Sequence, residues 1–229
     1  MKKLLIAAVL LCLTACTTTA VRTAAPSAIA APVANSKVLV VEPDIQLSLL
    51  TAAGLQEARQ DWSKQGHDNL SASLKQALQS KTHRFEVLDP ETARDGRPGQ
   101  LLRLHDAVGQ SIMAFNYGAF KLPNKRGAFD WTLGDGAQVL GKEHEADYAL
   151  FVTGRGSYSS AGRKMMFLAV AALGVGIPLG SQTLFASLVD LHTGQVVWFN
   201  VALAGPQADM RSPEGAASLT QSLLKGAPL

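Results

Sequence analysis

The chain has little of what most reaction centres and small cross-linked domains require. It contains two cysteines, and both lie within the first sixteen of its 229 residues. The five histidines are scattered without metal-ligand spacing, and the basic residues form no run of the kind that displaces counterions from nucleic acid. These absences argue against a disulfide framework, a metal site and a nucleic-acid partner. Stability is therefore expected to come from the packing of a hydrophobic core.

Motifs of nucleotide binding and nucleophilic catalysis are incomplete. The Gly-Arg-Gly stretch at 154–156 has no third glycine at dinucleotide-binding spacing, and the Gly-Arg-Lys stretch at 162–164 lacks the Ser or Thr of a phosphate loop. Ser160 has no nucleophile-elbow glycine before it, so we expect it to cap a helix. The Glu-His-Glu cluster at 143–145 is adjacent in sequence, which favours a solvated surface over a metal site. The sequence predicts no catalytic residue and no cofactor.

The N-terminus carries a secretory signal. Lys2 and Lys3 precede an apolar stretch at 4–13, about half the roughly 20 residues that a spanning helix needs. The stretch ends in Leu-Thr-Ala-Cys at 13–16, which resembles the lipobox of bacterial lipoproteins. That resemblance implies a signal peptide at 1–15, fatty acyl chains such as palmitate on Cys16, and a membrane anchor. Thr17, in place of an aspartate that favours inner-membrane retention, implies the outer membrane with the domain facing the periplasm.

The segment after the cysteine has the composition of a linker. Residues 17–36 are almost all Ala, Thr, Pro and Ser, with Arg22 as the one charge, and cannot bury enough surface to fold. We expect residues 16–36, which include the lipidated Cys16, to form a flexible tether with an end-to-end distance of about 25 Å. Residues 37–229 suffice for one domain with a sizeable core.

Short apolar runs predict the strands. The run at 37–43 is stopped by proline, and alternation at 45–49 then predicts a continuation past a bend. Further strands are expected at 84–88, 146–153, 183–191 and 195–203. The last two form a hairpin, because Gly194 can take the positive φ of a tight reversal.

Helical spacing of apolar residues predicts helices that cover this sheet. The expected segments are 57–80, 101–115, a short helix within 133–141, and 213–224 with Ser212 as its cap. Their inward stripes comprise Trp62, Leu70, Leu74 and Leu78 in the first helix and Leu101, Leu104, Val108, Ile112 and Phe115 in the second, which follows a turn at 96–99. The expected fold is an α/β domain with a mixed sheet of about five strands and amphipathic helices packed on it.

The element order and two motifs resemble a known group of envelope proteins. The motifs are Ala-Asp-Tyr at 146–148 and the phrase LVDLHTGQVVW at 188–198. The group has the fold of the TolB amino-terminal domain and includes the curli-secretion-channel lipoproteins and the lipoprotein activators of penicillin-binding proteins. The resemblance covers residues 37–224 and implies that Gly194 makes a turn and Trp198 fills the core. It implies no particular activity.

The segment between residues 154 and 189 is the candidate functional region, because no charge follows Arg163 and Lys164 as far as residue 189. Three interpretations stay open: a buried helix on the sheet, a membrane-spanning helix, or a contact with lipid or a partner protein. The curli-channel group uses the corresponding region for barrel hairpins, but residues 165–173 lack the polar alternation of a barrel strand. The contact interpretation involves Arg163, Lys164, Met165, Met166, Phe167, Leu168 and Val170.

The sequence as a whole predicts a lipid-anchored lipoprotein of the bacterial cell envelope that is not an enzyme. Its expected partners are the membrane, reached through the N-terminal lipid, and another envelope protein that it binds or helps to assemble. Two alternatives stay open. One is a homo-oligomeric component of a secretion or export channel, and the other is a hydrolase with a nonstandard site.

Overall fold

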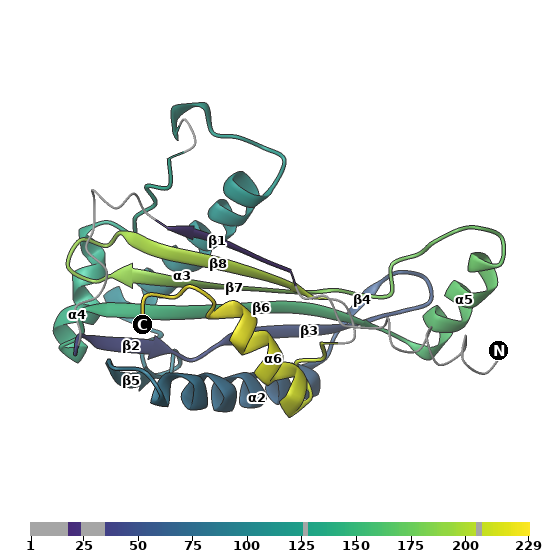
Figure 1. The fold of residues 1–229 in the computed structure, drawn as a ribbon, viewed down its shortest axis with the longest axis horizontal. Coiled ribbons are helices and arrows are strands. Elements are labelled where there is room, and N and C mark those ends of the chain that lie inside the picture. Colours follow the sequence, from purple (N-terminus) through teal and green to yellow (C-terminus); the bar gives the residue numbers. More distant parts are fainter. Residues whose placement is uncertain (1–17, 24–34, 126–127, 205–207) are drawn as a thin grey trace, which may run out of the picture.

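The computed structural model describes residues 18–23, 35–125, 128–204 and 208–229. Within them the chain forms one mixed sheet with helices on both faces and an arm that projects from one end (Figure 1). The predicted signal peptide and Cys16 lie outside the described residues. The predicted fold class, an α/β domain built on a mixed sheet, is confirmed.

In the described part of the chain the sheet has eight strands, and β6 lies in its middle. The main path runs through β1 (Thr18–Thr23), β8 (Val196–Ala204), β7 (Gln182–Asp190), β6 (Tyr148–Ser159), β2 (Lys37–Val41) and β5 (Arg84–Leu88). Two further strands, β3 (Asp44–Leu50) and β4 (Gln56–Ala58), form a hairpin beside the second half of β6. Strand β6 is parallel to β2 and β3 and antiparallel to β7. The expected bend at Pro43 separates β2 from β3.

Each face of the sheet has its own hydrophobic core. Val38 and Val40 of β2 point into the core under α2 (Gln60–Gln79) and α6 (Pro213–Leu223). Leu39 and Val41 point into the opposite core under α3 (Gly96–Ile112) and α4 (Gln138–His144). This alternation follows from the two-residue period of a strand. The remaining helices are α5 (Ala161–Ala171), a π-helix at Met113–Tyr117, and 3₁₀ turns at Pro123–Lys125 and Asp135–Ala137.

The apolar stripe of the first predicted helix is confirmed. Leu70, Leu74 and Leu78 are buried against the sheet, and Trp62 packs at the margin of the same core. The helix begins at Gln60 rather than at 57, because Gln56–Ala58 pair with β3 as β4. The predicted cap of the last helix is also confirmed, since Ser212 Oγ accepts a hydrogen bond from the Gly215 N–H.

The second predicted helix is rotated relative to the expectation. Leu104 is exposed, and His105 lies in the core in its place. The predicted turn at 96–99 is the first turn of α3. The rotation has a packing cause: a Cβ atom on Gly109 would lie 2.8 Å from the Phe185 ring, so the glycine lets the helix approach β7 along that line. The inward line is therefore Leu101, His105, Gly109 and Ile112.

Part of the predicted tether is a strand. Thr18–Thr23 pair in antiparallel register with β8, from Thr18 opposite Leu203 to Thr23 opposite Trp198. The expectation of a tether without regular structure is therefore wrong for these six residues. Pairing at a sheet edge uses backbone N–H and C=O groups, so it does not require the hydrophobic pattern that predicts the other strands.

The predicted hairpin between β7 and β8 is confirmed, with Gly194 at φ 74° and Trp198 fully buried. A Cβ atom on Gly194 would lie 2.1 Å from the Gly134 carbonyl oxygen, so the turn also packs against the segment before α4.

We predict that Gly194→Ala lowers the free energy of unfolding by about 2 kcal/mol or more, because it adds a strained backbone and a clash with backbone atoms. Gly136→Ala is the matched control, since its Cβ would meet nothing within 4 Å. Urea denaturation of the two variants checks the prediction. Equal midpoints for both variants would show that the turn tolerates a side chain.

Candidate functional site

The candidate site is the arm, which we define as residues 157–181. The pairing of β6 with β7 ends where Gly156 lies opposite Gln182. Strand β6 stays paired with β3 as far as Ser159, and the chain then leaves the sheet until it returns at the start of β7. Figure 1 shows α5 at the end of this excursion, away from the two helix-covered faces. Within the described residues, no helix is long and apolar enough to cross a membrane.

Local sequence signals account for the helix of the arm. Ser160 caps α5, because its Oγ accepts a hydrogen bond from the Arg163 N–H at 3.2 Å. This confirms the predicted capping role of Ser160. The helix consists of Ala, Met, Leu and other residues that tolerate helical geometry, and it gives way to Gly174 at φ 78°.

The base of the arm is fixed to the sheet by hydrogen bonds to the returning chain. The Ser157 N–H donates to the Ser181 carbonyl at 2.9 Å, and Ser159 Oγ donates to the Leu179 carbonyl at 2.8 Å. Gly180 lies so close that a Cβ atom there would be 2.2 Å from the Ser157 carbonyl oxygen. The arm therefore leaves the sheet in a defined direction.

The tip of the arm, in contrast, is exposed and apolar. Its exposed large side chains are Met165, Met166, Leu168, Leu173 and Val175, with Leu168 62% and Leu173 81% exposed. With Leu55, in the nearby β3–β4 turn, they make up six of the ten exposed large hydrophobic side chains in the described part of the chain. A buried helix on the sheet is therefore wrong for this segment, since α2, α6, α3 and α4 already cover both faces.

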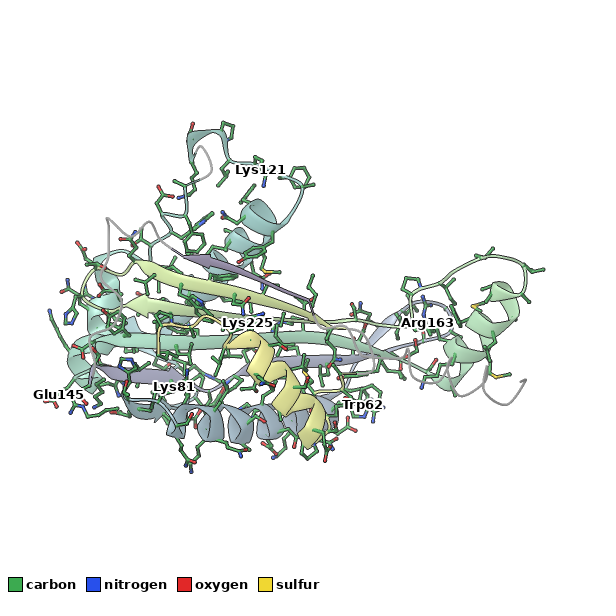
Figure 2. The ribbon with its side chains drawn as sticks, viewed as in Figure 1. Trp62, Lys81, Lys121, Glu145, Arg163 and Lys225 are labelled. Carbon is green, nitrogen blue, oxygen red and sulfur yellow. The ribbon has the colours of Figure 1, made fainter. Side chains whose placement is uncertain are left out.

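The residues predicted to make the contact divide into three groups. Lys164, Met165, Met166 and Leu168 are exposed, whereas Phe167 and Val170 are half-buried. Arg163 is buried and does not lie on the exposed surface. Its Nε donates to the Pro178 carbonyl at 2.8 Å, so it closes the base of the arm (Figure 2). The expectation that Arg163 meets anionic groups outside the protein is therefore wrong. Its guanidinium instead donates a hydrogen bond to a backbone carbonyl of the returning chain.

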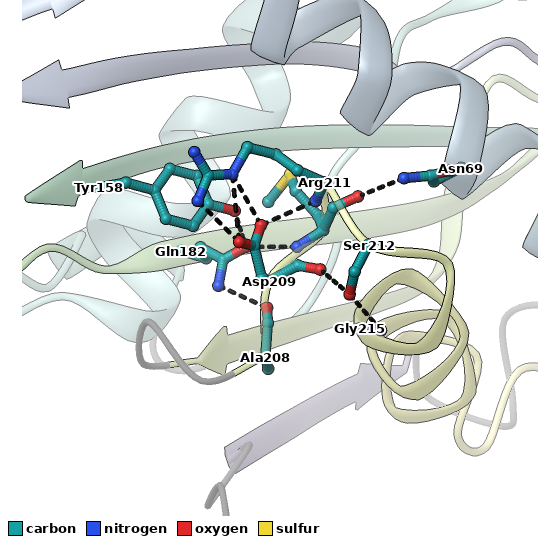
Figure 3. A network of polar contacts seen from close by, with 9 residues as sticks. Asn69, Tyr158, Gln182, Ala208, Asp209, Arg211, Ser212 and Gly215 are labelled. Carbon is teal, nitrogen blue, oxygen red and sulfur yellow. Dashed lines mark hydrogen bonds and ion pairs between the residues drawn. The ribbon is translucent and has the colours of Figure 1, made fainter.

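A polar network supports the sheet side of this base (Figure 3). The Arg211 guanidinium lies over the Tyr158 ring at 3.7 Å and over the Trp62 ring of α2 at 4.4 Å, and it forms an ion pair with Asp209. The Tyr158 hydroxyl donates to Gln182 Oε1 at 2.6 Å, and the Met210 N–H donates to the same oxygen. The network thus joins β6, β7, α2 and the start of α6.

The ionisation of this network fits a structural role. Burial raises the pKa of Tyr158, so its hydroxyl stays protonated and can donate. Burial disfavours the charged form of Asp209, but its hydrogen bonds with Arg211 outweigh that effect and lower its pKa. No sequence pattern indicates this cluster, because Tyr158 and Arg211 lie on distant segments and belong to no periodic pattern.

A second polar pair lies in the core under α3. His105 Nε2 and Ser187 Oγ are 2.6 Å apart and share a hydrogen bond, and the imidazole stacks on the Phe151 ring at 3.7 Å. Burial lowers the pKa of His105 to about 3. His105 forms part of the floor of a cavity of 300 Å³, but Ser187 does not line it and is 1% exposed. A substrate therefore cannot reach this hydroxyl, and the pair is structural.

The Glu-His-Glu cluster at 143–145 lies at the surface, as the sequence predicts, and its side chains have different surroundings. Glu143 and Glu145 are exposed, whereas His144 Nδ1 lies 2.8 Å from Glu86 on β5. Two hydrogen bonds, the larger effect from Lys37 and the smaller from His144, lower the pKa of the Glu86 carboxyl. Among the described residues, no group of three or more His, Cys, Asp or Glu side chains is placed to hold a metal ion.

Comparisons with known proteins leave the family open. No family model matches the sequence, and no curated protein matches it. Two PelC dodecamer structures from Paraburkholderia phytofirmans align over 93% of this chain at 14% identity, covering 96% and 98% of theirs, with TM-scores of 0.38 and 0.39. The LpoB C-terminal domain from Salmonella enterica aligns over 76% of this chain and 85% of its own at 12% identity, with a TM-score of 0.29. Values this low carry no functional argument.

We predict that His105 makes stability depend on pH. Its pKa is about 3 in the folded chain against 6.5 when unfolded, so the unfolded chain takes up the proton first as the pH falls. The free energy of unfolding is therefore highest above pH 6.5 and falls progressively as the pH drops toward 3, with a loss of about 2 kcal/mol by pH 5. Urea denaturation at pH 7 and pH 5 measures it.

His105→Gln removes the titrating group and should reduce this pH dependence, whereas His192→Gln, at an exposed position in the β7–β8 turn, should retain it. An unchanged pH dependence in His105→Gln would contradict the assignment.

Proposed function

We propose that the protein is a lipid-anchored, non-enzymatic binding module of the bacterial cell envelope and that the arm is its contact surface. Cys16 supplies the anchor, the outer membrane is the expected location, and the domain faces the periplasm. The partner surface is apolar and is presented by α5 rather than by a pocket within the domain.

One observation carries this proposal: a firmly attached arm ends in five exposed large apolar side chains. Burying each such side chain is worth roughly 1.5–3 kcal/mol, so the exposed tip forgoes stabilisation that a contact would recover. Exposed apolar patches of this kind mark interaction surfaces more often than structural faces. The buried His105–Ser187 pair, a serine–histidine contact that could suggest a hydrolase, is closed to substrate.

A second candidate function is a component of an oligomeric secretion or export channel. The observation that favours it is the pair of unlike sheet edges, β1 on one side and β5 on the other. An edge strand presents unpaired backbone groups, and head-to-tail contact between unlike surfaces closes into a ring when the rotation permits.

We predict that a photo-crosslinking amino acid in place of Leu168 forms adducts with another envelope component, lipid or protein, in intact cells. The same amino acid in place of Leu104, which is exposed on α3, is the matched control and should give few adducts. Equal yields at the two positions would argue that the arm has no special role in contact.

We predict that the mature protein begins at Cys16 and carries acyl chains. Intact-mass spectrometry of detergent-extracted protein should give a chain of residues 16–229 with the added mass of lipid, and Cys16→Ala should lack that addition. An unmodified chain that begins at another residue would contradict the anchor.

The mass of the extracted protein in mild detergent, measured by light scattering, separates the two candidate functions. A monomer or dimer is expected for an anchored binding module. A ring-sized assembly would instead favour the channel component.

A further inference from the structure

We infer that the arm lies in the same lipid surface that holds the acyl chains of Cys16, so that the domain meets the membrane at two points. The inference rests on the proposed lipid anchor and adds the orientation of the domain. It commits the apolar tip to lipid rather than to a protein partner.

The strand register places the N-terminal segment at the arm end of the sheet. Thr18 of β1 lies opposite Leu203 of β8, and Leu203 lies opposite Thr183 of β7. Thr183 in turn lies opposite Arg155 of β6. The first residue of β1 is therefore level with the last pairs of β6 and β7, at the end of the sheet from which the arm projects.

Chain length then limits where the anchor can be. Cys16 precedes Thr18 by two residues, which span at most about 7 Å. From Arg155, β6 continues over four residues to Ser159, a rise of about 13 Å, before α5 begins. The tip of the arm therefore extends at least as far toward the lipid surface as Cys16 can.

The docked β1 also removes the spacing that a free tether would provide. With residues 16–36 flexible, the domain could stand about 25 Å from the lipid surface. With Thr18–Thr23 paired to β8, only the chain before Thr18 separates the anchor from the sheet. The arm end of the domain is thus held at the surface, and the opposite end, with the β7–β8 turn, points away from it.

The chemistry of the arm suits a lipid surface. Within residues 157–181 the arm has Arg163 and Lys164 but no aspartate or glutamate. Lys164 is exposed beside Met165 and Met166, so its ammonium can meet lipid phosphates while the apolar side chains enter the acyl boundary. With eleven residues, α5 is about 16 Å long, which fits a helix that lies in the interface.

The turn between β3 and β4 extends this surface. Leu55 is 67% exposed, and a Cβ atom on the neighbouring Gly54 would lie 3.4 Å from an Arg163 guanidinium nitrogen. The turn therefore sits against the base of the arm. Its apolar side chain adds to the same end of the molecule.

Depth-dependent fluorescence of the full lipidated protein in vesicles tests the inference. The mature chain offers no other free thiol, because Cys12 leaves with the signal peptide and Cys16 is acylated. Leu168→Cys, labelled with the environment-sensitive dye NBD, reports on the arm, and Val87→Cys is the matched control. The two side chains are similarly exposed, at 62% and 58%. Circular dichroism verifies that both labelled variants remain folded.

The control position is far from the arm along the sheet. Val87 lies opposite Val40, which lies opposite Leu150 of β6, nine residues and about 30 Å before Ser159. In vesicles of phosphatidylethanolamine and phosphatidylglycerol, the label at 168 should shift to the blue and lose most of its fluorescence to doxyl-labelled lipids. The label at 87 should do neither.

The outcomes separate this inference from the function on which it rests. If the protein floats with the vesicles but the label at 168 behaves like that at 87, the anchor stands and the lipid contact of the arm is overturned. If the label at 168 responds only after envelope proteins are added, the occupant is a protein, and the inference is likewise overturned. If the acylated protein does not float with vesicles, the anchored module itself fails.

Discussion

The structure depends on the central strand β6, whose two halves pair with different neighbours. Its first half pairs with β2 and lies between two cores, whereas its second half pairs with β3 and continues into the arm. The second half can do so because Gly154 and Gly156 leave room for β3: Cβ atoms there would lie 2.7 Å from Ile45 Cδ1 and 2.8 Å from Leu47 Cδ2. The glycines that first suggested an incomplete phosphate loop are thus packing positions.

This arrangement explains why an apolar helix remains outside the domain. Helices on both sides already cover the faces of the sheet, so α5 has no free face to join. The hydrogen bonds of Ser157, Ser159 and Arg163 to the returning chain hold the base of the arm, and the Arg211 network fixes the strands behind it. The tip therefore extends from a hydrogen-bonded base, and its apolar side chains stay exposed, which is the observation behind the proposed contact.

The structure matches the prediction from sequence where a local pattern has one physical meaning. Leu70, Leu74 and Leu78 repeat at helical spacing, and Ser160, Ser212 and Gly194 have the capping and turn chemistry that the structure uses. The structure departs from the prediction where long-range packing determines which residues are buried. The choice of His105 over Leu104 as the inward residue depends on how closely Gly109 approaches Phe185, and the inward turn of Arg163 depends on a carbonyl fifteen residues away. The pairing of β1 depends on a free edge that no composition can indicate.

The orientation inferred for the protein depends on that pairing, because it brings the predicted anchor to the arm end. Hydrogen exchange of the Thr18–Thr23 amides in the full lipidated protein tests it most directly. If β1 is paired with β8, the amides that face β8 exchange far more slowly than those of an unstructured peptide, in vesicles and in detergent alike. Exchange of all six amides at the unstructured rate would contradict the docked strand and free the domain from the orientation inferred for it.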